Sequence, residues 1–200
     1  DVKNSIDMVL SLNGIPVVAI ELKNQFTGQD VNDSREQWMY NRNPKEPLFH
    51  FDNRILAYFG CDLYEAIMAT ELKGEKTYFM PFNQGSNGAG NVGGAGNPPS
   101  EDGDYATSYL WKKVLRRDVL LAILQRYIMR QEETTISLIM DKHGKEKEVK
   151  HTSTKIIFPR YHQLDAVEKL IHDTAKNGAG KNYLIQHSAG SGKSNSIAWL

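Results

Sequence analysis

The chain has 200 residues, of which 40% are apolar and 24% charged, and its formal net charge is zero. This composition fits one large or two small globular domains and excludes a globally basic nucleic-acid binder, so any such surface must be local. Cys61 is the only cysteine, which excludes an internal disulfide and fits a reducing compartment such as the cytoplasm. No apolar run reaches the length of about eighteen residues that a membrane span needs.

The first predicted element is a β-hairpin, because two apolar stretches flank Asn13-Gly14. Asp7, Glu21 and Lys23 are charged residues in these otherwise apolar strands. Burying charge is costly unless the charge is paired or binds a metal ion. Two facing carboxylates can bind Mg²⁺, and a lysine beside them can activate a water or stabilise charge on a phosphate. The set therefore predicts a site for hydrolysis of a phosphodiester.

The register of this hairpin decides whether the two carboxylates meet. A strict two-residue turn sets Asp7 opposite Ile20, which turns Asp7 away from Glu21. A three-residue loop or one bulge sets Asp7 opposite Glu21 instead. The metal site therefore requires an irregular hairpin, and Pro16 favours one because it cannot donate a ladder hydrogen bond.

A helix is predicted next, over about residues 29–42, with Thr27 or Asp30 near its start. Gln37 and Tyr40 on this helix could contact DNA phosphates or orient the active site. Alternatively, Trp38 anchors an ordinary surface helix. Short strands are then predicted around residue 49 and over residues 55–59, 63–70 and 77–80, which gives a mixed α/β sheet.

A low-complexity, glycine-rich loop is expected at about residues 84–104, as a functional flap or a flexible insertion. Two helices should follow, over residues 108–116 and 119–131, with Thr107 and Asp118 as N-caps. Strand-like segments flank a turn at His143-Gly144, and a short apolar run at 156–158 ends at a proline. An amphipathic helix is predicted from Arg160 to about residue 176, then a buried strand at 183–185.

That last strand leads into HSAGSGKS, residues 187–194, which should open a helix, the context of a phosphate-binding loop. Its glycines let backbone N–H groups approach phosphates, Lys193 would reach the β- and γ-phosphates, and Ser194 would bind Mg²⁺. The alternative is a glycine-rich turn whose lysine is merely solvated. Upstream, Arg160 and Gln163 can bracket an adenine, or simply begin a helix. The residues expected to bind ATP are Arg160, Gln163, Gly190, Ser191, Gly192, Lys193 and Ser194.

These motifs together resemble a known family. Asp7, followed by Glu21-Leu22-Lys23, looks like the PD-(D/E)xK nuclease motif. The runs NGIPVVAIELKN and YLWKKVL, and the pairing of RYHQ with GSGKS, are similar to the restriction (R) subunit of type I restriction-modification enzymes. The resemblance implies an α/β fold. A mixed-sheet endonuclease domain, truncated at its N-terminus, would span residues 1–131, and the start of a RecA-like motor lobe would span 132–200.

The resemblance also implies roles for particular residues. Asp7 and Glu21 match the ligands of the nuclease Mg²⁺, Lys23 the catalytic lysine, and Gln163 the adenine-reading glutamine. Lys193 and Ser194 match the phosphate loop of the motor. The family's Gln-x-x-x-Tyr is one residue shorter here, at Gln37 and Tyr40.

The implied function is Mg²⁺-dependent cleavage of double-stranded DNA, coupled to ATP-driven translocation. The implied partners are DNA and the methyltransferase and specificity subunits. Two alternatives stay open, namely another ATP-dependent nuclease-helicase and a nucleotide-dependent scaffold with an inactive nuclease fold.

Overall fold

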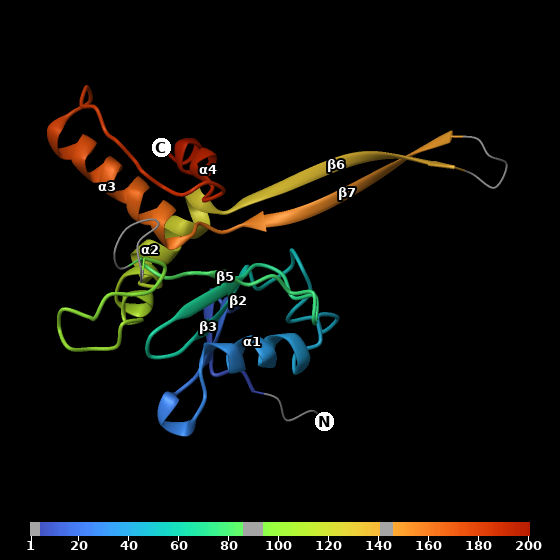
Figure 1. The fold of residues 1–200 in the computed structure, drawn as a ribbon, viewed down its shortest axis with the longest axis horizontal. Helices are drawn as coiled ribbons and strands as arrows, with labels where there is room; N and C mark the ends of the chain where they lie inside the picture. The colour runs from blue at the N-terminus through green and yellow to red at the C-terminus, as the bar shows by residue number, and fades with distance from the viewer. Residues whose placement is uncertain (1–4, 86–93, 141–145) are drawn as a thin grey trace.

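The computed structural model describes residues 5–85, 94–140 and 146–200 (Figure 1). Its centre is a five-stranded sheet in the order β1-β2-β3-β4-β5. Strands β2 and β3 are parallel, and the other neighbouring strands are antiparallel. The predicted mixed α/β sheet is thus confirmed. The strands are β1 Met8–Leu12, β2 Ile15–Leu22, β3 Ala57–Cys61, β4 Ala66–Ala69 and β5 Met80–Pro81.

The hairpin of β1 and β2 turns at Asn13-Gly14, where both residues have positive φ, as a tight two-residue turn requires. The ladder is not regular, because Ser11 pairs with Pro16 whereas the preceding residue of β1 pairs with Val18. Val17 is therefore skipped, which is a β-bulge. The irregular hairpin that the metal site requires is confirmed.

One face of the sheet is covered by α1, Val31–Tyr40, which Asp30 caps as predicted. The helix approaches closely at Gly60 of β3, where an added Cβ would collide with the side chain of Ser34. Trp38 is fully buried and its Nε1 donates to the carbonyl of Phe59 at 3.0 Å. The helix is therefore tied to the sheet along its length, and its inner face looks onto β2 and β3.

The other face packs against η2 Leu110–Val114, α2 Arg117–Ala122 and η3 Ile123–Tyr127. The predicted caps were wrong. Thr107 is buried and donates to the carbonyl of Asp62 at 2.6 Å, and Asp118 lies inside the first turn of α2, paired with Arg116. The last helical turn ends at Tyr127 rather than 131, because β6 begins two residues later.

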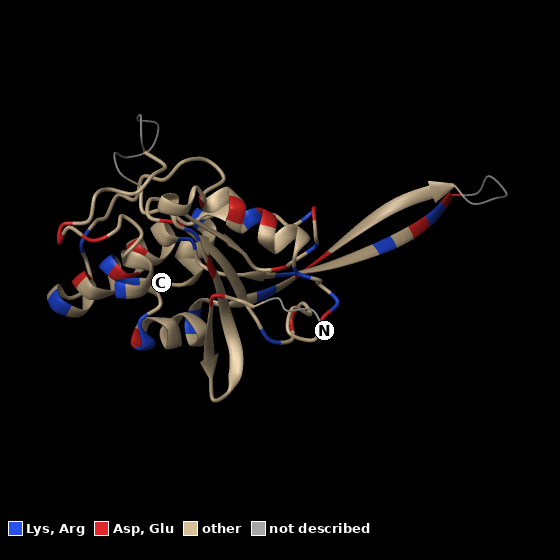
Figure 2. Cartoon of the chain, turned by 90° about the horizontal axis from the view of Figure 1, so that it is seen from below, with Lys and Arg blue, Asp and Glu red and all other residues tan. Residues whose placement is uncertain are grey.

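Strands β6 Met129–Met140 and β7 Glu146–Ile157 form a two-stranded ribbon that projects from the body (Figures 1 and 2). Acidic and basic residues are interspersed along β7, from Glu146 to Lys155, whereas residues 134–140 of β6 include no charged side chain (Figure 2). Helix α3, Tyr161–Asn177, follows as predicted, and α4, Lys193–Ala198, follows the glycine-rich loop. No helix in the described ranges is long and apolar enough to cross a membrane.

Three predicted strands differ in the structure. Phe49 lies in a turn and packs in the core, and the segment 77–80 contributes only Met80 to a strand. Residues 183–185 form no strand, and Leu184 is 93% exposed. A buried strand needs neighbouring strands for its hydrogen bonds, and none pairs with this segment in the described residues.

The expected RecA-like lobe over 132–200 therefore stays a prediction. So does the boundary at 131, a residue that lies within β6.

Candidate functional site

The charged residues of the hairpin meet on the face of the sheet that α1 covers. Glu21 is fully buried there. Its Oε1 pairs with Arg42 Nη2 at 2.5 Å, and its Oε2 accepts from Gln37 Nε2 at 2.8 Å. The Oε1 of Gln37 in turn accepts from Lys23 Nζ. Gln37 thus links the two strand residues, because its amide donates to the acid and accepts from the lysine.

Asp7 completes the group through the bulge. Continuing the ladder past Met8, which pairs with Ile20, sets Asp7 opposite Glu21. The Oδ2 of Asp7 accepts from the backbone N–H of Leu22 at 2.8 Å, which holds the carboxylate at the end of β2. The structure thereby brings together Asp7, Glu21 and Lys23.

Burial has the largest effect on the pKa of Glu21. Loss of hydration raises the pKa of this carboxyl, and Arg42 opposes the rise through its hydrogen bond and its charge. The nearby Asp7 adds to the rise. Repulsion between two carboxylates of this kind is relieved when a divalent cation binds between them.

The donor set fits Mg²⁺. The two carboxylates offer hard oxygen ligands, and Mg²⁺ usually keeps several waters and takes only one or two protein carboxylates. No cluster of three or more His, Cys, Asp or Glu side chains suited to a metal occurs in the described part of the chain, so a site with more protein ligands is not built here. Each oxygen of Glu21 accepts one hydrogen bond and keeps a second lone pair for a cation.

The helix residues separate into two groups. Gln37 bonds to Glu21 and Lys23, whereas Trp38 anchors the helix to the sheet, and a role of Gln37 in orienting an active site stays a prediction. Tyr40 is the last residue of α1 and is exposed. Arg42, which follows the helix, is a partner of Glu21 that the sequence analysis did not predict. A buried carboxylate requires a partner, so the apolar surroundings of Glu21 in the sequence could have prompted a search for a nearby arginine.

The glycine-rich loop packs against the start of α3 and forms a second candidate site. Gly190 and Gly192 have φ of 72° and 81°, a conformation that favours glycine. Lys193 Nζ donates to the carbonyl oxygens of Ser188 at 2.9 Å and His187 at 3.3 Å. These are neutral acceptors, which the charged oxygens of a phosphate can replace. Ser194 is exposed at the same helix start.

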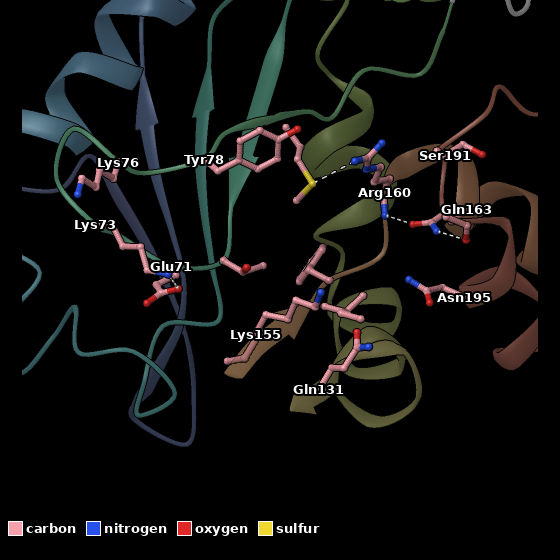
Figure 3. A pocket seen from close by; sticks show the side chains of 17 residues that line it. Glu71, Lys73, Lys76, Tyr78, Gln131, Lys155, Arg160, Gln163, Ser191 and Asn195 are labelled. Atoms are coloured by element: carbon pink, nitrogen blue, oxygen red, sulfur yellow. Dashed lines mark hydrogen bonds and ion pairs between the residues drawn. The ribbon is translucent and has the colours of Figure 1, made fainter. Parts of the chain in front are cut away.

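Arg160 and Gln163 lie beside this loop, in a cavity of about 430 Å³ that reaches from the loop to the turn between β4 and β5 (Figure 3). Gln163 Nε2 donates to the carbonyl of Gly192 at 2.7 Å, and its Oε1 accepts from the backbone N–H of Arg160 at 2.9 Å. Gln163 therefore braces the loop. The same cavity is lined by the cationic side chains of Lys73, Lys76, Lys155 and Arg160.

Comparison with known proteins gives a family match for the N-terminal part of the chain. Residues 1–87 match the family model described as "Type I restriction enzyme R protein N terminus". No curated protein and no solved structure matches the chain. The matched residues contain β1 to β5 and α1, and with them Asp7, Glu21, Lys23, Gln37 and Arg42. Residues 1–87 of this chain are thus similar to the N-terminal region of type I restriction enzyme R proteins, which supports the resemblance seen in the sequence.

Proposed function

We propose that the chain is part of the DNA-cleaving and ATP-dependent DNA-translocating subunit of a type I restriction endonuclease, in which Asp7, Glu21 and Lys23 hydrolyse phosphodiesters with Mg²⁺. The observation that carries this proposal is the bulge at Val17. It aligns Asp7 with Glu21, and Gln37 joins Glu21 to Lys23. A regular hairpin would have separated the carboxylates.

Each residue then has a role that follows from its surroundings. Asp7 and Glu21 would hold Mg²⁺, which supplies a polarised phosphate oxygen and a more acidic water. Lys23 shares the face of Glu21 and carries a positive charge that can stabilise the transition state of phosphate hydrolysis. Gln37 orients both side chains, and Arg42 limits the rise in the pKa of Glu21 that burial causes.

The glycine-rich loop supports the ATP-dependent half of the proposal. Arg160, Gln163 and residues 190–192 line one end of a cavity, and Lys193 and Ser194 follow directly at the start of α4. Gly190 and Gly192 have the positive φ that lets a loop turn its backbone N–H groups toward an anion. We assign Lys193 to the β- and γ-phosphates of ATP and Ser194 to its Mg²⁺. Double-stranded DNA and the methyltransferase and specificity subunits are the proposed partners.

A second candidate is a nucleotide-dependent scaffold with an inactive nuclease fold. The observation that favours it is the buried ion pair, because Arg42 and Gln37 already engage both oxygens of Glu21. In that case the charges serve stability alone. Removing one partner of a buried pair costs about 3–5 kcal/mol, so every activity would fall together.

The test is a paired measurement on the full-length protein. Asp7→Ala should lower DNA cleavage by at least about a hundred-fold, and Lys23→Ala by a factor of about 10²–10³, because each acts on the reacting phosphate. Both variants should keep ATP hydrolysis, whereas Lys193→Ala should abolish it. Asp118→Asn, a change in an exposed ion pair, is the control. Joint loss of cleavage and ATPase in Asp7→Ala, or retained cleavage, contradicts the nuclease assignment.

A further inference from the structure

Two histidine rings meet between the first turn of α3 and the start of the glycine-rich loop. The ring centroids of His162 and His187 are 4.8 Å apart, and the ring planes are 81° apart. The Nε2 of His162 lies 3.0 Å from the carbonyl oxygen of Ser191. A carbonyl oxygen only accepts hydrogen bonds, so the Nε2 carries the proton and donates it. Neither ring has a role in the proposed function so far.

The surroundings keep both rings neutral near pH 7. Burial lowers the pKa of His162 most, and the carbonyl of Ser191 opposes that change only in part. Burial also lowers the pKa of His187, and the charge of Lys193 acts in the same direction. The cavity beside the rings is also lined by Arg160, Asp165, Lys169 and Tyr183. The opposite charges of Asp165 and Lys169 form an ion pair at 2.6 Å and so offset each other.

We propose that His162 is a positioning residue of the nucleotide site, which orients the backbone of the phosphate loop through Ser191 and is held in place by His187. The inference rests on the proposed ATP site. It concerns the orientation of the loop, whereas the ATP assignment concerns the groups that touch the phosphates.

The physical reason is the planarity of the peptide bond. The described peptides are all trans, so the C=O of one residue points opposite to the N–H of the next. By holding the carbonyl of Ser191, His162 fixes the direction of the N–H of Gly192. Gln163 does the same one peptide later, because it holds the carbonyl of Gly192 and so fixes the N–H of Lys193.

Two adjacent residues of α3 thus orient two successive backbone donors of the loop. External restraint matters here, because Gly190 and Gly192 have far more backbone freedom than other residues. If the backbone donors become ordered only when the ligand binds, the entropy lost in ordering them weakens binding. His162 therefore pre-organises the loop before nucleotide enters.

The test is the affinity of the full-length protein for Mg²⁺-ATP, measured by calorimetry on variants of His162. His162→Leu should weaken binding about five-fold, the equivalent of one net hydrogen bond. His162→Gln should bind within about two-fold of the unmodified protein, because its amide N–H can replace the Nε2 donor. His172→Leu is the matched control, since His172 is exposed and lies ten residues further along the same helix.

Four results separate this inference from its alternatives. Equal affinity in His162→Leu and the unmodified protein overturns it, and so does a His162→Gln variant that binds as weakly as His162→Leu. His187→Ala should also weaken binding, and the loss from His162→Leu should be smaller on that background, because the two rings act together. Full additivity contradicts the role of His187. Unchanged affinity in Lys193→Ala would instead refute the nucleotide site itself.

Discussion

Glu21 is a buried carboxylate between β2 and α1, and its two oxygens face different partners. Arg42 supplies a positive charge, and Gln37 supplies a neutral donor that also binds Lys23. Burial raises the pKa of Glu21, and Arg42 limits that rise. At the proposed metal site Mg²⁺ would bind the carboxylate form, so the arginine would control how acidic the medium can become before the metal is lost.

Replacing Arg42 should therefore move the acid limb of cleavage. A raised pKa means that Glu21 takes up a proton at a higher pH than an ordinary carboxyl, so Mg²⁺ affinity falls as the pH drops through that pKa. Arg42→Met removes the two effects that lower the pKa, and the acid limb should shift to higher pH. The measurement is the pH profile of cleavage at limiting Mg²⁺, and excess Mg²⁺ should partly restore activity by mass action.

Arg54→Met is the control for this experiment, because Arg54 is an exposed arginine. Its pH profile should match that of the unmodified protein. A profile of Arg42→Met that falls at every pH by the same factor would mean that Arg42 acts on the reaction or on folding, and not through the ionisation of Glu21.

At the scale of the elements, the site depends on how closely α1 lies on the sheet. Gln37 reaches both Glu21 and Lys23 only because the helix backbone passes directly over β3. The absence of a side chain at Gly60 permits this approach, and Gly60 pairs with Glu21 in the parallel ladder. The closest packing and the charged cluster therefore lie at the same level of the sheet.

Gly60→Ala should loosen this arrangement. The new Cβ meets the hydroxyl of Ser34, so the helix must move away, at a cost of about 1–3 kcal/mol typical of overpacking. Because Gln37 moves with the helix, cleavage should also fall by more than the loss of stability explains. Ser34→Ala removes the colliding oxygen and should rescue part of both defects, as a chemical-denaturation series and cleavage rates can show. If Ser34→Ala on this background changes neither quantity, the close contact is not the cause.

The sequence predicts an element well where interactions between neighbouring residues determine its structure. The Asn13-Gly14 turn and the helix cap at Asp30 follow from local hydrogen bonding and backbone freedom, and both are confirmed. Pro16 even pointed to the irregular ladder that aligns Asp7 with Glu21. The partner of Glu21 was not predicted, because Arg42 reaches it through the tertiary fold, from 21 positions along the chain.

The wrong predictions have the same origin. Thr107 has the residue type of a helix cap, yet the tertiary structure uses its hydroxyl to bind the carbonyl of Asp62. The apolar run 183–185 has the pattern of a buried strand, but pairing partners and not pattern alone make a strand. The loop at 84–104 was assigned from composition. Its residues 86–93 lie outside the described ranges, and Asn97 binds Tyr64 and Asn83 at its far end.

At the scale of the whole molecule, the sheet and α3 share one hydrophobic core. Phe158 and Tyr161 pack edge-to-face against Phe82 from the end of β5, and Phe59 of β3 joins them. Lys113 of η2 pairs with Asp165 of α3 at 2.9 Å. The helix that carries Gln163 therefore packs on the same sheet that carries Glu21 and Lys23, on the opposite face.

This continuous core predicts that the sheet does not fold when the chain is cut at 131, the domain boundary expected from the resemblance. A fragment 1–131 loses β7 and α3, and with them the buried side chains of Phe158, Tyr161, Leu164 and Val167. Removing a single large core side chain costs about 2–5 kcal/mol, and a whole domain is stable by only about 5–15 kcal/mol.

A fragment 1–178, which retains α3, is the matched control and should unfold cooperatively on heating, followed by circular dichroism. The fragment 1–131 should show no such transition and should expose apolar surface to a hydrophobic dye. A cooperative transition in 1–131 at the temperature of the longer fragment would mean that the sheet is an independent unit and that α3 adds nothing to its stability.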